Sequence, residues 1–316
     1  MLRDPLSPLA RLPWEDGLEI APAEPGLPGV SIVIPVFNAG EFLEKTLRSL
    51  MCNDLSGVEL ILMDGASTDN TAAILEHYRD IFAVAVSEPD RGQSDAINKG
   101  FARATQPILY WLNGDDLILP GALLAVRRAF RDDPEAQVVV GDAWMTEKDF
   151  SPIRHFRFTP ETLAFGHLLD YAANHLIQPS VFFTRTAWDE AGPVKEALHY
   201  AMDADLFLGM AARHRFRHIP VDIGYSVYHE GCKTRGKLAE SITELALVQA
   251  AHGGIDQARR TLDILVGLFN EAERRPAAAA ATTPAQQILL NRLQALEEEV
   301  EKNRALLLDL DIRLTA

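Results

Sequence analysis

The sequence has few cysteines, few positive charges and no long apolar run, and each shortage excludes a class of protein. The two cysteines, Cys52 and Cys232, form neither a metal-binding motif nor a disulfide framework, so we expect a reducing, cytoplasmic setting. Lys and Arg number 30 against 45 Asp and Glu, and this net charge of −15 argues against a protein that coats nucleic acid. No stretch approaches the roughly 18 apolar residues of a membrane span, which leaves at most peripheral contact with the inner face of a membrane.

What the chain does contain is enough apolar material for one large α/β domain. It has 316 residues, 47% of them hydrophobic. Residues 1–29 form a proline-rich arm without the apolar run of a signal peptide. Short apolar runs typical of strands then alternate with helical patterns, and the predicted strands are Val30–Val36, Val58–Met63, Phe82–Val86 and Pro107–Leu112. This alternation predicts right-handed crossovers and a mostly parallel central sheet flanked by helices.

Acidic residues follow two of these predicted strands. Asp64 ends one strand, and Asp115 and Asp116 come directly after another. Ligands of parallel α/β sheets bind at the carboxyl ends of the strands, so we expect a site there. Adjacent carboxylates repel unless a cation stabilises them, and their oxygens suit Mg²⁺ or Mn²⁺. The alternative is structural: Asp116 caps the helix that begins near Pro120, or forms a turn with Gly114.

The second half of the chain has a less regular pattern. The predicted strands are Val138–Gly141, Val181–Thr184 and Ile223–Val227, and the predicted helices are Pro160–Leu169, Arg185–Ala191 and Asp203–Arg213. We divide the chain into the arm, an α/β domain over 30–236, a helical extension over 237–274, an Ala/Pro linker over 275–286 and a last helix over 287–316.

The last helix carries a heptad seam. Apolar residues alternate at spacings of four and three, with one polar member: Leu289, Leu293, Leu296, Val300, Asn303, Leu307, Leu310 and Leu314. This is the repeat of a coiled coil, in which a buried Asn fixes the register. We therefore expect a homo-oligomer joined through the Leu289–Leu314 coiled coil. The alternative is a helix that packs back onto its own domain.

Several phrases of the sequence together resemble family 2 glycosyltransferases of the GT-A fold, which is Rossmann-like. They span about residues 30–235 in the order SIVIPVFNAG (31–40), LMDGASTDNT (62–71), SEPDRGQSDAINKG (87–100), YWLNGDD (110–116), QPSVFF (178–183) and YAMDADLFLGMA (200–211). Each phrase is weak alone, and the ordered set is specific. The resemblance implies an α/β GT-A domain followed by the all-helical extension and coiled coil.

The resemblance also implies roles for individual residues in a donor pocket. Pro35, Phe37 and Asn38 would form the wall of the nucleotide pocket, and Asp64 would hydrogen-bond the base. The remaining donor contacts would be Asp90, Arg91, Asp95, Asn98, Asn113, Asp115 and Lys233. Arg91 and Asp95 equally fit a surface ion pair.

A divalent cation is implied by the same resemblance. Asp115 matches the metal-binding aspartate of the D-x-D element, Asp116 follows it, and His229 lies where such enzymes supply a late histidine to the metal or diphosphate. The sequence departs from the family pattern at Asn113, the first position of that element. A second departure is Gly65, where many members carry another aspartate.

Asp203 matches the general base of inverting members. A sugar hydroxyl is a poor nucleophile, so a carboxylate must take its proton during attack on the anomeric carbon. Asp205 is a weaker candidate, and Asp203 also fits a helix N-cap.

The expected function is therefore inverting transfer of a sugar from a nucleotide-diphosphate-sugar donor to a glycan, lipid-linked or protein-linked acceptor. The alternatives are a catalytically silent nucleotide-sugar-binding or scaffolding protein and a nucleotidyltransferase. The latter would need a Gly-rich phosphate loop after the first strand, where this chain has Pro35-Val36-Phe37-Asn38.

Overall fold

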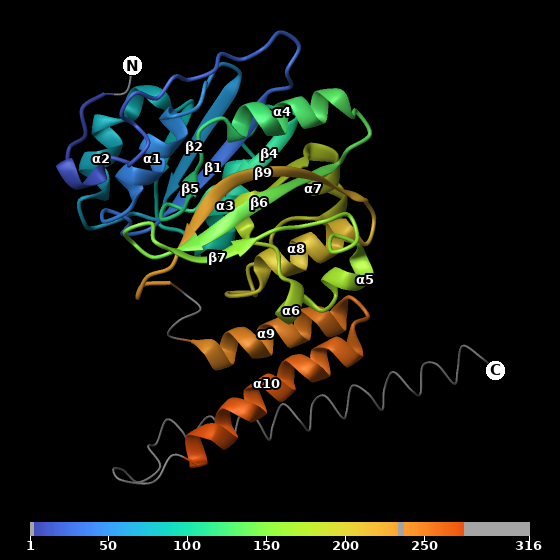
Figure 1. Cartoon of the computed structure of the whole chain (residues 1–316). Helices are drawn as coiled ribbons and strands as arrows, with labels where there is room; N and C mark the ends of the chain where they lie inside the picture. Colours follow the sequence, from blue (N-terminus) through green and yellow to red (C-terminus); the bar gives the residue numbers. More distant parts are fainter. Residues whose placement is uncertain (1–2, 233–236, 275–316) are drawn as a thin grey trace. The chain divides into compact units, whose positions relative to one another are not determined.

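One sheet of nine strands organises the chain, and its first half is parallel (Figure 1). In the computed structural model β1 (Val30–Val36) lies between β2 (Val58–Asp64) and β4 (Ile108–Trp111), and β3 (Val84–Ser87) pairs with β2. All residues of β1 are buried, as is typical of a parallel strand with helices on both faces. The carboxyl ends of β1, β2 and β4 therefore meet at one edge of the sheet.

The second half of the sheet is mixed, and here the expectation of a mostly parallel sheet is wrong. β8 (Val181–Thr184) runs antiparallel between β4 and β6 (Val138–Thr146), whereas β9 (Phe216–Val227) runs parallel to β6. β5 (Leu117–Ile118) pairs antiparallel with β9, and β7 (Pro152–Phe156) with β6. The turn between β6 and β7 is too short for a crossover helix, so the two strands must be antiparallel. The strand order is β3-β2-β1-β4-β8-β6-β9-β5.

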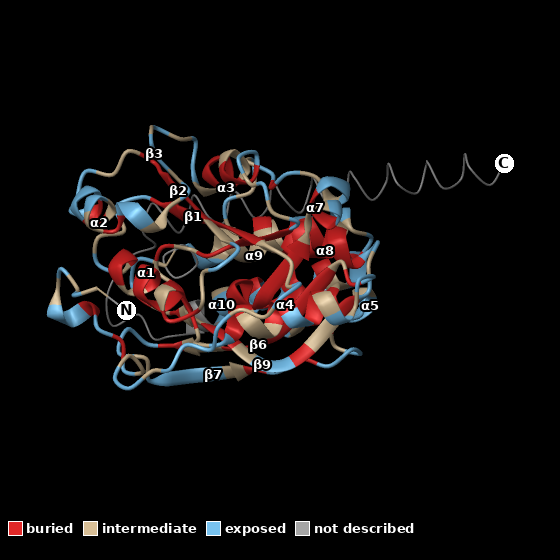
Figure 2. Cartoon of the chain, turned by 90° about the horizontal axis from the view of Figure 1, so that it is seen from above, coloured by how far each residue is buried: buried red, intermediate tan, exposed pale blue. Residues whose placement is uncertain are grey.

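Helices cover both faces of the sheet (Figures 1 and 2). Residues of α1 (Leu43–Met51), α2 (Thr71–His77) and α4 (Ala122–Asp132) pack in one apolar cluster, and residues of α3 (Gln93–Phe101), α7 (Arg185–Ala191) and α8 (Met202–Ala211) pack in another. α8 is the most deeply buried of them, and Figure 2 shows it almost entirely red. The predicted helix Arg185–Ala191 is found with the same bounds as α7.

The remaining helices are short or follow the last strand of the sheet in the sequence. They are the 3₁₀ helices Pro8–Ala10, Arg79–Ile81 and Gln178–Ser180 and the helices α5 (Phe165–Leu168), α6 (Tyr171–Asn174), α9 (Leu238–Ala251) and α10 (Ile255–Arg274). The expected helix Pro160–Leu169 is mostly a turn, because the Thr159 and Thr162 hydroxyls hydrogen-bond nearby backbone groups.

The structure describes residues 3–232 and 237–274, and the chain divides into two units, Met1–Leu265 and Val266–Ala316. The expected linker 275–286 and the coiled coil 287–316 lie outside the described residues. Among the described helices, none combines the length and apolarity that crossing a bilayer demands.

The N-terminal arm is irregular, as expected, and a buried ion pair fastens it to α1. The side chains of Arg48 and Glu15 are each only 3% exposed, and Arg48 Nε donates to Glu15 Oε1 at 2.8 Å. Arg48 also donates to the Arg3 carbonyl at 2.8 Å. Glu44 accepts from the backbone N–H of Ser7 at 3.1 Å and from the Tyr78 hydroxyl at 2.9 Å. These contacts satisfy every charge that the arm buries against α1.

Removing one member of the Arg48–Glu15 pair should destabilise the fold strongly. Glu15→Gln leaves the Arg48 guanidinium buried without its counter-charge, and we expect the free energy of unfolding to fall by about 3–5 kcal/mol. The double variant Arg48→Met/Glu15→Leu should lose less unfolding free energy than the sum of the losses in Arg48→Met and in Glu15→Leu. Urea titration measures both, with Glu76→Gln in the exposed Arg79–Glu76 pair as the control that stays near wild type. A Glu15→Gln midpoint equal to wild type would contradict the anchoring role.

Candidate active site

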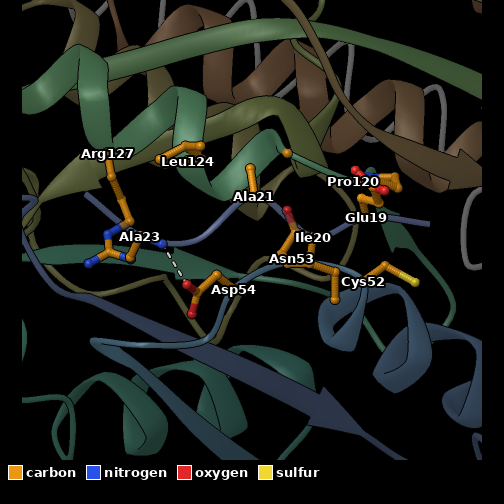
Figure 3. Close-up of a pocket in the computed structure, with 11 residues that line it drawn as sticks. Glu19, Ile20, Ala21, Ala23, Cys52, Asn53, Asp54, Pro120, Leu124 and Arg127 are labelled. Carbon is orange, nitrogen blue, oxygen red and sulfur yellow. Dashed lines mark hydrogen bonds between the residues drawn. The ribbon is translucent and has the colours of Figure 1, made fainter. Parts of the chain in front are cut away.

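A small hollow lies under the N-terminal arm, and its polar groups hold the arm in place (Figure 3). The cavity measures about 150 Å³. The backbone N–H of Ala23 donates to Asp54 Oδ2 at 2.5 Å, and Arg127 donates to the carbonyls of Pro28 and Ser56, both at 2.8 Å. Because these groups are used in fastening the arm, we assign this hollow a structural role.

A much larger cavity, about 930 Å³, opens at the carboxyl edge of the parallel strands. The expected site residues that line it are Pro35, Phe37, Asn38, Asp90, Asn113, Asp115, Asp116 and His229. They come from the end of β1 and from the loops after β1, β3, β4 and β9, so the fold gathers them from four separate segments. This is the edge at which the sequence predicts ligand binding.

The loops after β1 and β2 carry backbone strain at the cavity. Asn38 and Ala66 have φ values of +49° and +62°, in the left-handed region that non-glycine residues rarely adopt. The contacts of Asn38 hold this conformation, since its Oδ1 accepts from the backbone N–H of Thr68 at 2.9 Å and its own N–H donates to Ser67 Oγ at 2.8 Å. Strain that the surroundings maintain in this way is typical of functional sites.

Asp64 lies beside the cavity, and its carboxylate has partners within the protein. It is 3% exposed and accepts from the hydroxyls of Ser67 and Ser87, the second at 2.5 Å. Its contact with a nucleotide base stays a prediction. A Cβ at Gly65 would lie 2.7 Å from Asp90 Oδ2, the end of a flexible side chain, so this contact alone does not explain the departure at Gly65.

Three of the expected donor contacts do not line the cavity, namely Arg91, Asp95 and Asn98. Arg91 and Asp95 form an ion pair, which was the alternative that the sequence left open. Arg91 donates to Asp95 Oδ1 at 3.0 Å and to Glu196 Oε1 at 2.8 Å. Burial alone would raise the pKa of Asp95, but hydrogen bonds from Arg91 and Lys99 outweigh it and lower that pKa to about 2. Asn98 exchanges two hydrogen bonds with the backbone of Val194. Their contacts with a donor stay predictions.

Asp115 and His229 form the central pair of the site. His229 Nε2 lies 3.0 Å from Asp115 Oδ2, although 114 residues separate them. The backbone N–H of Gly231 donates to His229 Nδ1 at 3.1 Å, which places the imidazole proton on Nε2, toward Asp115. Phe42 stacks on the imidazole, with ring centroids 4.2 Å apart, and so fixes its plane.

Asp116 points into the protein. Its Oδ1 accepts from the backbone N–H of Val227 at 3.1 Å, and its Oδ2 accepts from Asn113 Nδ2 at 3.0 Å. Burial, and next the charge of Asp115, raise the pKa of Asp116 to about 8. Because both oxygens have partners, its contacts fit a positioning role more closely than the expected metal ligation, which stays untested.

Asn113 occupies a place that a second aspartate would fit poorly. Its Nδ2 donates to Asp116 and to Gln178 Oε1 at 3.2 Å, and its Oδ1 accepts from Gln93 Nε2 at 2.7 Å. Gln178 in turn donates to the Trp111 carbonyl at 2.7 Å, so its amide orientation is set. Only a side-chain amide supplies both donors and acceptor here, which accounts for the departure from D-x-D.

The donor set at Asp115 and His229 fits a divalent cation. Metal–ligand distances of roughly 2.1 Å put neighbouring ligands of one ion about 3 Å apart, close to the separation of Asp115 Oδ2 and His229 Nε2. Ligation by Nε2 requires the imidazole proton to move to Nδ1, and hence the N–H of Gly231 to turn away. Asp115 needs no such change.

Asp203 occupies the first turn of α8, and within this helix it is the one residue that is not buried. Ser94 Oγ contacts Met202 Sδ at 2.9 Å, so the first turn of α8 lies against α3, whose neighbours Gly92 and Gln93 line the cavity. Asp205 accepts from Lys195 at 2.8 Å and from His252 at 3.0 Å. Asp203 is therefore the less buried of the two carboxylates of α8, and it is not among the residues that line the cavity.

Sequence reasoning missed several residues of the cavity. Phe42 and Lys148 are brought there by contacts between distant segments, and no local motif marks them. Gln178, which hydrogen-bonds Asn113, lies in the phrase QPSVFF, but the sequence assigned it no role. Lys233 lies outside the described residues.

A second group of potential ligands lies on β6, β7 and β9, where Asp142, His155 and Asp222 offer atoms within 4.8 Å of one another. His155 Nε2 lies 2.6 Å from Asp222 Oδ1, while Arg157 donates to His155 Nδ1 at 3.0 Å. That donation leaves the proton of His155 on Nε2, toward Asp222, so the group is satisfied by hydrogen bonds without an ion.

The fold is that of the GT-A class. S. aureus TarS 1–349 in complex with UDP-GlcNAc superposes with a TM-score of 0.54 at 18% identity, over 70% of this chain and 66% of that one. The mannosyltransferase PcManGT from Pyrobaculum calidifontis, in complex with GDP-Man and Mn²⁺, gives 0.53 at 18% identity, over 91% and 84%.

The sequence itself shows the family. The model of glycosyl transferase family 2 matches residues 31–189, half of the chain. A PGL/p-HBAD biosynthesis glycosyltransferase of Mycobacterium bovis (strain BCG / Pasteur 1173P2) is 34% identical over 131 residues, which cover 39% of this chain and 50% of that relative. The chain belongs to glycosyl transferase family 2, and it is a glycosyltransferase.

Replacing Asn113 by aspartate should destabilise the metal-free protein. Asn113→Asp removes the donors to Asp116 and Gln178 and adds a carboxylate beside two others, so we expect a loss of about 1–3 kcal/mol in unfolding free energy. Asn70→Asp adds the same charge at an exposed helix start and serves as the control. Thermal and urea unfolding in the presence of a chelator measure the difference. Equal losses in the two variants would contradict the assigned network.

Proposed function

We propose that this protein transfers a sugar from a nucleotide-diphosphate-sugar donor to an acceptor hydroxyl, with inversion at the anomeric carbon. The observation that carries the proposal is the pairing of Asp115 with His229 in a 930 Å³ cavity at the carboxyl edge of the parallel strands. Asp203, at the solvent-accessible start of α8, supplies the second carboxylate. Asp115 holds a divalent cation, Mn²⁺ or Mg²⁺, and Asp203 is the general base.

The related structures support a nucleotide-sugar donor. TarS was solved with UDP-GlcNAc, and the mannosyltransferase was solved with GDP-Man and Mn²⁺. In this chain the end of β1 and the strained loop after it bring Pro35, Phe37 and Asn38 to the cavity. Phe37 is exposed, so its ring is available for the nucleotide. Asp64, Asp90 and Asn113 would complete the donor contacts.

The chemistry requires two carboxylates in different surroundings. Asp203 takes the proton of the acceptor hydroxyl as its oxygen bonds to the anomeric carbon, and the bond from that carbon to the diphosphate oxygen breaks on the opposite face. The cation, when bound, supplies positive charge to the departing diphosphate. Asp116 positions Asp115 through the Val227 hydrogen bond, and Phe42 keeps His229 in plane.

The acceptor is proposed to be a glycan or a lipid-linked or protein-linked sugar. A lipid-linked acceptor would be met at the inner membrane surface by a cytoplasmic enzyme. Self-association through Leu289–Leu314 stays a prediction, since those residues lie outside the described ones.

Calorimetric titration of UDP, GDP and dTDP, each with and without Mn²⁺, tests the proposal. One nucleotide should bind in a metal-dependent manner, and Asp115→Ala should lose that dependence because the cation loses its carboxylate. Asp203→Asn should bind the nucleotide like wild type but lower the turnover number for transfer by roughly 10²–10⁴-fold, since it cannot accept a proton.

Asp205→Asn is the matched control for Asp203→Asn, because it lies on the same helix but contacts Lys195 and His252. Asp205→Asn should clearly lower the free energy of unfolding but change the turnover number only slightly. The proposed donor class would be wrong if none of the nucleotides bound with or without metal. The assignment of Asp203 would be wrong if Asp203→Asn retained full turnover.

A further inference from the structure

The cavity of the active site is strongly acidic. Four carboxylates line it, namely Glu41, Asp90, Asp115 and Glu230, beside the buried carboxyl group of Asp116. Among the described lining residues, Lys148 is the one Lys or Arg. A diphosphate adds further negative charge, and unpaired like charges gathered in one cavity repel one another. A cation at Asp115 offsets part of this repulsion, and the ammonium of Lys148 is the next positive charge available.

A rigid turn carries Lys148 to the cavity. The turn joins β6 to β7 and closes on itself, with Glu147 N–H donating to the Ser151 carbonyl and Phe150 N–H to the Glu147 carbonyl, both at 2.9 Å. Phe150 has a φ of +68°, which is costly for an aromatic residue. Its ring lies 6.0 Å from that of Trp14 and 6.2 Å from that of Tyr225, and this packing holds the strained turn in place.

Lys148 also lies on the aromatic stack that leads to Asp115. Its Nζ is 5.2 Å from the centroid of Phe42, and Phe42 stacks on His229, which contacts Asp115. The ammonium and the proposed metal site thus both lie next to one stacked pair of rings. Two positive charges next to the same stack suit two neighbouring phosphate groups.

The present partner of Lys148 is easily exchanged. Its Nζ donates to Glu41 Oε1 at 2.7 Å, but the side chains are 47% and 64% exposed. An exposed pair of this kind contributes about 0–1 kcal/mol. Replacing the Glu41 carboxylate by a phosphate oxygen at the cavity therefore costs little.

We infer that Lys148 binds the diphosphate of the nucleotide-sugar donor, exchanging Glu41 for a phosphate oxygen next to the Phe42–His229 stack. The inference rests on the proposed function and extends it to a residue on the β6–β7 turn that carries no family motif. Glu41 is then a competitor, which holds the ammonium at the cavity mouth until the donor enters.

Calorimetry on the full chain with Mn²⁺ tests this inference, using the nucleoside diphosphate that binds wild type and the matching free nucleoside as probes. Lys148→Gln should weaken diphosphate binding by roughly 10- to 100-fold, as expected for a charged hydrogen bond, and leave nucleoside binding unchanged. Lys148→Arg should retain most of the affinity. Glu41→Gln should bind the diphosphate more tightly, because the competitor is gone.

Lys45→Gln is the matched control. Lys45 Nζ lies 5.3 Å from the ring of Phe150, which is on the same turn as Lys148. Lys45 does not line the cavity, so Lys45→Gln should leave diphosphate binding unchanged. The role of Lys148 would be overturned if Lys148→Gln bound the diphosphate with wild-type affinity, or if it weakened nucleoside and diphosphate binding equally. The proposed function would still be supported in that case, provided that the wild-type protein bound the diphosphate in a metal-dependent manner. If wild type bound no nucleoside diphosphate, both would be wrong.

Discussion

The buried carboxylate of Asp116 is the contact on which the site depends. It joins the loop after β4 to the end of β9, through Asn113 on one oxygen and Val227 on the other. Asp115 is its neighbour in sequence, and His229 is two residues beyond Val227. Fixing Asp116 to Val227 therefore fixes Asp115 opposite His229. This contact extends the antiparallel pairing of β5 with β9, which joins the two loops although more than a hundred residues separate them in the sequence.

That contact explains why an amide replaces the first aspartate of the D-x-D element. Burial and the charge of Asp115 raise the pKa of Asp116 to about 8, so a further negative charge would add to an unfavourable environment. Asn113 instead donates to Asp116 and Gln178 and accepts from Gln93, so each of its polar atoms is used. The hydrogen bonds of the site thus explain why Asn113 replaces an aspartate. The replacement gives no ground for considering the chain catalytically silent.

The sequence predicted well those parts whose pattern is local. The β-branched runs of β1 and β2, the end of β2 at Asp64, the place of Asp115 soon after β4, and the helix Arg185–Ala191 are readable because side-chain periodicity reports burial directly. β5 is only two residues long, and β7 begins at a proline and is mostly exposed, so neither produces a strand pattern. Both are strands because β9 and β6 offer hydrogen-bonding edges, which is a property of the assembled sheet.

Site residues follow the same division. Asp115 follows a recognisable strand, whereas Phe42 and Lys148 reach the cavity through contacts across the fold. Arg91 and Asp95 show the opposite case, in which a motif position is occupied by an ion pair that holds α3 and the loop of Glu196 together. A charge in a motif carries no information about its partner until the distances are known.

The two carboxylates of α8 lie in different surroundings. Residues two apart on a helix point in different directions, so Asp203 and Asp205 have different neighbours. Asp205 is buried, which would raise its pKa, but hydrogen bonds from His252 and Lys195 outweigh burial and lower it, so its charge holds α8 to the segments around it. Asp203 is in the first turn and is the one residue of α8 that is not buried, and the burial of the rest of the helix holds its backbone in place.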